Sequence, residues 1–314
     1  MEKHGIVFMG TSAFAVPALK ELVGAGWPVT AVVTPPDRPQ GRGRTTAPPP
    51  VKIAARELGL DIIQTESVKD EAFLQTFRSL APEMVIVASF GQILPRSILH
   101  DPPGGCLNIH PSLLPRYRGA APLNWSIING ETTTGVTIMK MDEGVDSGDI
   151  LLQEETPLGE EETFGTLHDR LARMGAELLL KTITSLQKGE LLPKPQNHAL
   201  ATYAPPLGRE IGLIHWEDDC RKIVRLIRGL SPSPGAYTFL HRKKLKVFSA
   251  TAEEGATADS PGSVVQKEEG ALCIAAAGGL VCLGDVQLEG KKRMPVHDFL
   301  RGMAVTAGER MKET

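Results

Sequence analysis

Short apolar runs alternate with helical patterns along the first part of the chain. The apolar runs lie at residues 5–9, 29–34, 84–89 and 106–110. Such runs are typical of strands buried on both faces of a parallel sheet. Helical spacing occupies the intervals 16–25, 49–58 and 70–80. This alternation predicts a doubly wound, Rossmann-like α/β domain.

Two further strands and one long helix extend this domain. Residues 135–141 and 149–155 have strand character, and residues 162–190 have the pattern of an amphipathic helix. Thr163 is a suitable N-cap for this helix, and Gly189 follows its last periodic residue.

A proline-rich segment divides the chain into two parts. Residues 191–207 hold four prolines and little periodicity, which indicates a linker between a domain at 1–190 and a domain at 208–314. The second domain begins with an amphipathic helix at 216–230. Short strands follow it at 236–241, 244–250, 262–267, 271–277 and 280–287. This pattern predicts a small OB-like β-barrel.

Composition adds little to this picture, but the distribution of charge adds more. The apolar share of 41% and the charged share of 23% are ordinary for a globular protein, and the net charge is −3. Residues 209–246 nevertheless hold nine basic and four acidic side chains. A local basic face is compatible with a polyanionic partner, and an unevenly charged solvated surface is the alternative.

The cysteines and the start of the chain bear on the compartment. Cys106, Cys220, Cys273 and Cys282 have no CxxC spacing, which argues against a disulfide scaffold or a zinc site. The start, MEKHGIVFMG, lacks the apolar core of a signal peptide, and no stretch has the length of a membrane span. We therefore expect a cytoplasmic protein without a metal and without membrane association.

Two polar side chains stand at the end of a predicted buried strand. Asn108 and His110 are two residues apart, so they point to the same face. Open α/β sheets bind ligands at the carboxyl ends of their strands. A capping Asn and a hydrogen-bonded core His are the alternatives for each residue alone, and the pair favours a site. Cys106, on the same strand, is expected to be a small apolar core residue.

An acidic turn lies between two later strands. Residues 141–150 contain Asp142, Glu143, Asp146 and Asp149, without the spacing of a calcium loop. The turn is either a solvated connection or the source of one carboxylate that reaches His110. Spacing alone leaves open which acid this is. Residues 8–19 lack the glycine pattern of dinucleotide sites, so no nicotinamide cofactor is expected.

The segment LNIHPSLLPRYRGAAP, followed by VDSGDI, resembles the signature of folate-dependent formyltransferases. This resemblance implies that Asn108, His110 and Asp146 are catalytic. It places the folate site along Ser112, Leu113, Leu114 and Pro115. The expected donor is 10-formyltetrahydrofolate, used as a co-substrate.

Other segments are similar to the branch of this family that acts on initiator methionyl-tRNA. They are FMGTSAFA, the QGRGR loop, ATYAPPL, SPSPGAY and QLEGKKRMP, whereas Arg209 departs from the lysine more usual there. The resemblance implies an enzyme that formylates methionyl-tRNA for translation initiation, and we expect a monomer. The tRNA-binding residues are then expected to be Arg38, Arg42, Arg44, Lys222, Arg225 and Lys244. Without the resemblance, residues 35–50 would be taken for a mobile solvated loop.

Formyl transfer between two nitrogens needs an oxyanion partner and a proton carrier rather than a strong nucleophile. Asn108 is expected to donate to the oxyanion, and His110 to donate a second hydrogen bond and move the proton. Asp146 is expected to orient His110 and stabilise its charged form. Rival hypotheses are a formyltransferase for a sugar-nucleotide amine, which needs no basic second domain, a non-catalytic RNA-binding protein, and a nicotinamide dehydrogenase.

Overall fold

The computed structural model describes residues 5–40, 45–208, 210–265 and 270–312. The chain divides into two compact units. The first comprises Met1–Pro122, Thr133–Pro157 and His168–Ala204. The second comprises Leu123–Thr132, Leu158–Leu167 and Pro205–Thr314. Two short segments from the N-terminal part of the chain thus belong to the second unit.

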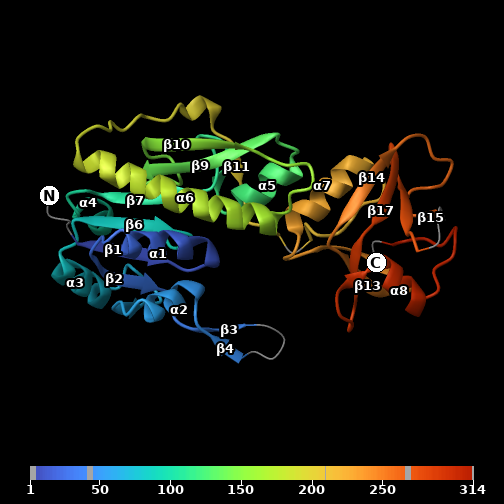
Figure 1. Ribbon diagram of the computed structural model, residues 1–314, viewed down its shortest axis with the longest axis horizontal. Helices are drawn as coiled ribbons and strands as arrows, with labels where there is room; N and C mark the ends of the chain where they lie inside the picture. The colour runs from blue at the N-terminus through green and yellow to red at the C-terminus, as the bar shows by residue number, and fades with distance from the viewer. Residues whose placement is uncertain (1–4, 41–44, 209, 266–269, 313–314) are drawn as a thin grey trace. The chain divides into compact units, whose positions relative to one another are not determined.

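A seven-stranded sheet with the order β10-β9-β7-β6-β1-β2-β5 forms the centre of the first unit (Figure 1). Its strands are β1 Ile6–Gly10, β2 Val29–Thr34, β5 Ile62–Gln64, β6 Met84–Ala88, β7 Cys106–His110, β9 Thr133–Lys140 and β10 Ile150–Pro157. The pairs β7–β9 and β9–β10 are antiparallel, and the other neighbours are parallel. The predicted α/β fold is confirmed, with a mixed sheet.

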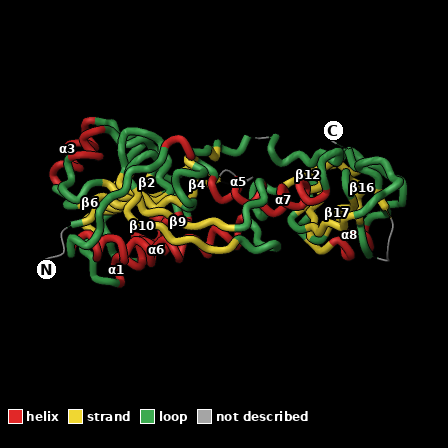
Figure 2. Tube along the Cα trace, turned by 90° about the horizontal axis from the view of Figure 1, so that it is seen from above, coloured by secondary structure: helices red, strands yellow, loops and turns green. Residues whose placement is uncertain are grey.

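Helices cover both faces of this sheet. In the first unit the helices are α1 Val16–Gly24, α2 Pro50–Glu57, α3 Glu71–Leu80, α4 Arg96–His100 and most of α6 Phe164–Gln187, with short 3-10 turns at Ala13–Ala15 and His198–Leu200. Helix α5 Pro122–Ile128 lies almost entirely in the second unit. Figure 2 shows α1 and α6 on one side of the strands and α3 on the other. Side chains alternate along β1, so Val7 and Met9 pack with Phe73 and Phe77 of α3.

The predicted helices agree closely with these elements. The first three differ from prediction by at most one residue at either end. The long helix begins after Thr163, whose Oγ1 accepts a hydrogen bond from the Thr166 N–H at 3.3 Å, as expected of an N-cap. Gly189 follows the helix with a φ of +68°. None of the helices in the described residues is long and apolar enough to cross a membrane.

Two pairs of short strands lie where the sequence predicts only loops. Within residues 35–50, β3 Arg38–Gln40 and β4 Thr45–Ala47 form an antiparallel hairpin. Within the predicted linker, β11 Tyr203–Ala204 pairs in parallel with β8 Arg118–Gly119. The end of the predicted linker is therefore hydrogen-bonded to the first unit.

The second unit contains two antiparallel sheets, with the orders β12-β13-β18-β19 and β14-β17-β16-β15. Their strands are β12 Ala236–Leu240, β13 Lys243–Val247, β14 Ala250–Glu254, β15 Val264–Val265, β16 Cys273–Ala276, β17 Gly279–Leu283, β18 Asp285–Leu288 and β19 Met294–Pro295. The helices are α7 Cys220–Leu230 and α8 Val296–Gly302. Helix α7 begins four residues later than predicted, because the Asp219 carboxylate caps it by accepting the N–H groups of Arg221 and Lys222.

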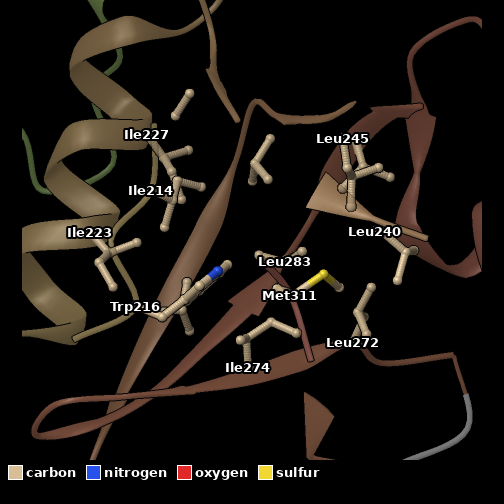
Figure 3. Packing of buried hydrophobic residues seen from close by; sticks show 14 of the residues in the cluster. Ile214, Trp216, Ile223, Ile227, Leu240, Leu245, Leu272, Ile274, Leu283 and Met311 are labelled. Carbon is tan, nitrogen blue, oxygen red and sulfur yellow. The ribbon is translucent and has the colours of Figure 1, made fainter. Parts of the chain in front are cut away.

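One apolar core joins both sheets and α7 (Figure 3). Trp216 lies in this core beside Ile223, and its Nε1–H donates to the Thr238 hydroxyl at 3.1 Å. Leu245 of one sheet and Leu283 of the other belong to the same cluster. The predicted C-terminal β domain is confirmed, with antiparallel strands around a shared core.

A disulfide joins β16 to β17. Cys273 and Cys282 are directly opposite each other in the strand register and are bonded through their sulfurs. The spacing of the cysteines did not predict this bond, because the register of the strands creates the pairing. Together with Glu253 these residues form the one cluster of potential metal ligands among the described residues, but the sulfurs are bonded to each other.

Candidate active site

Strand β7 places Asn108 and His110 on one face of the sheet. Cys106, the first residue of this strand, lies on the same face, and its thiol is 3.0 Å from the Ile98 carbonyl of α4. His110 is 4% exposed, whereas Asn108 is only partly buried. Within the described residues the Asn108 side chain has no hydrogen-bond partner. Its amide is therefore available to a substrate.

A backbone carbonyl sets the tautomer of His110. The ring Nε2 lies 2.9 Å from the Tyr117 carbonyl oxygen, which can only accept, so Nε2 carries the proton. The other nitrogen, Nδ1, lies 3.7 Å from Asp146 Oδ2. The sequence predicted that the carboxylate would orient the ring. The geometry instead assigns that role to the Tyr117 carbonyl, because 3.7 Å is too long for a hydrogen bond.

The structure distinguishes the acids of the 141–150 turn. Asp142 accepts the Gly144 N–H at 3.0 Å and the Ser147 hydroxyl at 2.8 Å, so it stabilises the turn itself. Glu143 forms an ion pair with Arg96 at 2.7 Å, and this hydrogen-bonded partner lowers the pKa of Glu143. Asp146 is the acid that faces His110.

Asp146 has an unusual backbone and a fixed side chain. Its φ is +49°, in the left-handed region that residues with a side chain seldom adopt. The Gly119 N–H donates to Asp146 Oδ2 at 2.8 Å. Gly119 has a φ of +116°, and a Cβ at this position would lie 2.8 Å from the Ala204 carbonyl oxygen. Only glycine fits this close approach of β8 to β11.

The four predicted folate-site residues form a turn after β7. Ser112 is 2% exposed, and its hydroxyl donates to the Arg116 carbonyl at 2.7 Å. Leu114 is also buried, and its N–H donates to the Thr137 hydroxyl at 3.2 Å. Leu113 and Pro115 are partly exposed. The side chains of Ser112 and Leu114 thus support the turn, and folate binding by this segment stays a prediction.

Of the predicted tRNA-binding residues in the N-terminal part, the structure describes one, Arg38. Arg38 begins β3 and forms an exposed ion pair with Glu66 at 3.1 Å. Arg42 and Arg44 lie outside the described residues. Lys52 fixes the base of the hairpin, since its Nζ donates to Asp37 and to Gln64, each at 2.7 Å.

The basic side chains of the second unit have varied surroundings. Lys222 forms an exposed ion pair with Asp218 at 2.7 Å, and Lys244 lies over the ring of Tyr237 at 3.9 Å. Arg225 is partly exposed. Arg228, on the same helix as Lys222 and Arg225, donates to the carbonyls of Gly159 and Glu162. Burial lowers the pKa of Arg228.

Sequence reasoning missed the groups that hold the site together. Tyr117 and Gly119 act through backbone atoms, which no side-chain pattern reveals. Gln196 lies in the predicted linker, yet it is 5% exposed and contacts the Asp146 loop. The thiol of Cys106 is excluded as a nucleophile at neutral pH, because burial raises its pKa to about 12.

Comparisons with known proteins give matches in both parts of the chain. The profile described as "Formyl transferase" matches residues 4–183, and the profile "Formyl transferase, C-terminal domain" matches residues 206–304. A protein of Syntrophus aciditrophicus named methionyl-tRNA formyltransferase is 53% identical, over 98% of this chain and 99% of its own length. A protein of Citrifermentans bemidjiense with the same name is 48% identical, over 96% and 95%.

Solved structures share the fold at lower identity. HypX from Aquifex aeolicus, crystallised with tetrahydrofolic acid, is 19% identical with a TM-score of 0.67, over 95% of this chain and 47% of its own. The sugar 3N-formyl transferase WlaRD is 18% identical with a TM-score of 0.64, over 93% of this chain and 100% of its own.

Proposed function

Because this chain belongs to the formyl transferase family, we propose that it moves the formyl group of 10-formyltetrahydrofolate to the amino group of initiator methionyl-tRNA. The observation that carries the proposal is similarity over the whole chain, including the second domain, to proteins named for this reaction. The Asn108 amide, which has no hydrogen-bond partner among the described residues, and Nδ1 of His110, which faces Asp146 at 3.7 Å, are chemically suited to it.

The reaction forms one C–N bond and breaks another. The neutral amine of the methionyl group attacks the formyl carbon, and the formyl oxygen becomes an oxyanion. Asn108 donates its amide N–H to this oxygen, a role in which one donor contributes roughly 10²–10³ in rate. Collapse of the tetrahedral intermediate then breaks the bond between the formyl carbon and the folate nitrogen.

His110 carries the proton between the two nitrogens. Since Nε2 is committed to the Tyr117 carbonyl, Nδ1 accepts the proton that the attacking amine loses. The same nitrogen then returns it to the departing folate nitrogen, which therefore leaves as a neutral amine. The Asp146 carboxylate, 3.7 Å away, stabilises the imidazolium between these two steps through its charge.

Binding of the tRNA is assigned to the hairpin and to the second domain. Arg38, Arg42 and Arg44 belong to the segment that contains the hairpin, and Lys222, Arg225 and Lys244 belong to the second domain. Arginine and lysine pair with phosphates, and arginine also stacks on bases. The folate is assigned to the turn of Ser112, Leu113, Leu114 and Pro115, which follows the strand of Asn108. The protein is proposed to act as a cytoplasmic monomer.

A direct assay tests the proposal. The purified protein is incubated with 10-formyltetrahydrofolate and initiator methionyl-tRNA, and formyl-methionine is released from the tRNA and quantified. We expect turnover with this tRNA and none with a 3-amino sugar nucleotide. Transfer to the sugar nucleotide alone would refute the proposed acceptor. Detection of a formylated protein by intact mass would refute direct attack.

A further inference from the structure

The backbone conformation of Asp146 requires support from its surroundings. A non-glycine residue with a φ of +49° occupies a sparsely populated region, and it persists only where neighbouring groups fix it. Its side chain is anchored by the Gly119 N–H. Its backbone carbonyl accepts a hydrogen bond from Gln196 Nε2 at 2.9 Å.

Gln196 holds the Asp146 loop at two points. Its Nε2 also donates to the Gly148 carbonyl at 2.7 Å, so both N–H groups of the amide bind backbone oxygens of one loop. Its Oε1 accepts from Arg118 Nε at 3.2 Å and from Nη2 at 2.6 Å. The amide has one possible orientation, because guanidinium can only donate and carbonyls can only accept.

Arg118 directs its charge at this amide. The side chain is buried at 4% exposure, and no ion pair joins it to a carboxylate in the described part of the chain. Its remaining partner is His198 Nδ1 at 3.1 Å. A hydrogen bond from a charged donor is stronger than a neutral one, and it polarises the amide so that the Gln196 N–H groups donate more strongly in turn.

We propose that Gln196 and Arg118 are positioning residues, which hold the Asp146 carboxylate against His110 Nδ1. This inference rests on the proposed function, in which Asp146 stabilises the charged His110. The Asp146 carboxylate is held through Gly119 of β8, and its backbone is held through Gln196. Arg118 of β8 orients Gln196, so the side-chain and backbone supports meet on the same two-residue strand.

The sharpest test is Gln196→Glu. This change keeps the size and the acceptor for Arg118, but it places a carboxylate oxygen against the carbonyls of Asp146 and Gly148. We expect kcat to fall by about 10- to 100-fold through misplacement of Asp146. KM for both substrates should change by less than about threefold, since binding contacts remain. Gln196→Met, which removes the donors without adding charge, should act in the same direction.

A double-mutant cycle separates positioning from general damage. In an Asp146→Ala background, Gln196→Glu should change kcat by less than about twofold, because no carboxylate remains to be placed. Gln287→Glu is the matched control, since the Gln287 amide also donates to a carbonyl, that of Lys291 at 2.8 Å. It should leave kcat unchanged. Circular dichroism and urea unfolding check that each variant is folded.

The outcomes distinguish this inference from the proposed function. If Gln196→Glu lowered kcat equally in the presence and absence of the Asp146 carboxylate, the positioning role would be overturned. Wild-type kcat in folded Gln196→Glu and Gln196→Met proteins would overturn it as well. If Asp146→Ala itself retained wild-type kcat, the proposed catalytic role of Asp146 would fail and the positioning role with it. If the unaltered protein did not transfer the formyl group to the tRNA, the proposed function would fail, and the positioning role that rests on it would fail as well.

Discussion

At the scale of single residues, the candidate site depends on which nitrogen of His110 is free. The Tyr117 carbonyl occupies Nε2, so the exchangeable proton is assigned to Nδ1, on the side of Asp146. The carboxylate then contributes through its charge rather than through a hydrogen bond. In the proposed reaction, Asn108, His110 and Asp146 have three separate tasks.

Asn108→Ala tests the oxyanion donor. We expect kcat to fall by roughly 10²–10³ with little change in folding, because one preorganised donor is lost. The measurement is single-turnover formylation, accompanied by circular dichroism. Asn129→Ala, at an exposed asparagine, is the control and should keep normal kcat. A folded Asn108→Ala protein with wild-type kcat would remove this residue from the mechanism.

Cys106 makes a prediction about stability at alkaline pH. Burial raises the pKa of its thiol from 9.0 to about 12, so above pH 9 the unfolded chain releases a proton that the folded chain keeps. The free energy of unfolding should therefore fall by up to about 1.4 kcal/mol per pH unit from this group, between pH 9 and 12. Urea unfolding of wild type and Cys106→Ala at pH 8.0 to 10.5 measures the slopes, and identical slopes would contradict the prediction.

At the scale of elements, the β3–β4 hairpin is a short structure with a fixed base. Asp37 precedes the hairpin, and Lys52 lies in α2. The hydrogen bond from Lys52 lowers the pKa of Asp37, so this carboxylate is ionised at neutral pH. The side chain of Lys52 in α2 thus fixes the residue that precedes β3, the strand that begins with Arg38.

Lys52→Ala should loosen the base of this hairpin. The expected result is a several-fold rise in KM for the methionyl-tRNA with KM for the folate unchanged, because the hairpin no longer has a single orientation. Lys20→Ala is a suitable control, since Lys20 is exposed and lies 3.9 Å from its partner Glu57. An unaltered tRNA KM in the Lys52 variant would show that the base contact is irrelevant to binding.

Arg42→Ala tests the predicted role of the 35–50 segment in tRNA binding. Removal of one phosphate or base contact should lower kcat/KM for the tRNA by about tenfold, since a charged hydrogen bond contributes about 1.5 kcal/mol or more. Tetrahydrofolate affinity, measured by fluorescence quenching, should stay the same. An equal loss of affinity for the folate would contradict the assignment of Arg42 to tRNA binding.

At the scale of the whole molecule, charge is distributed unevenly between the two parts of the chain. Residues 1–207 hold 18 basic and 23 acidic side chains, a net of −5, and residues 208–314 hold 16 and 14, a net of +2. The net charge of −3 is therefore the sum of an acidic first part and a basic second part. Since many of its cations already have partners, such as Lys222 with Asp218, a tRNA must compete for them.

Salt should accordingly weaken tRNA binding much more than folate binding. If about three side chains contact phosphates, the slope of log affinity against log salt is near −2.7, a loss of about 40-fold between 50 and 200 mM salt. Filter binding of methionyl-tRNA across this range measures the slope. Lys244→Ala should reduce the slope by about one. A flat salt dependence would exclude phosphate contacts as the main source of affinity.

The fold was largely predictable because its strands are buried on both faces. Short apolar runs such as 84–89 are typical of buried strands in a globular protein, and the structure places β6 there. Weaker elements were missed: β5 has three residues, and α4 has five. Such short elements are specified by packing against neighbours, which local periodicity does not contain.

The candidate site was predictable only in part. Alternation along a strand identified Asn108 and His110, and family resemblance selected Asp146. Gln196 could not be found in this way, because its partners lie 78 residues away at Arg118 and 50 residues away at Asp146. A glutamine among prolines is typical of an exposed connection. Gln196 is buried only because of its tertiary contacts with Arg118 and the Asp146 loop.

The pairing of β11 with β8 limits where the catalytic part of the chain could be joined to a different C-terminal domain. Residues 184–205 lie between the two matched family profiles, and they include both Gln196 and β11. A recombination event that joined a new C-terminal domain at residue 184 would keep Asn108, His110 and Asp146. It would remove the segment with Gln196, which holds the Asp146 loop. Productive crossovers are therefore expected after Ala204, so this stretch should be inherited with the catalytic half and not with the module that follows it.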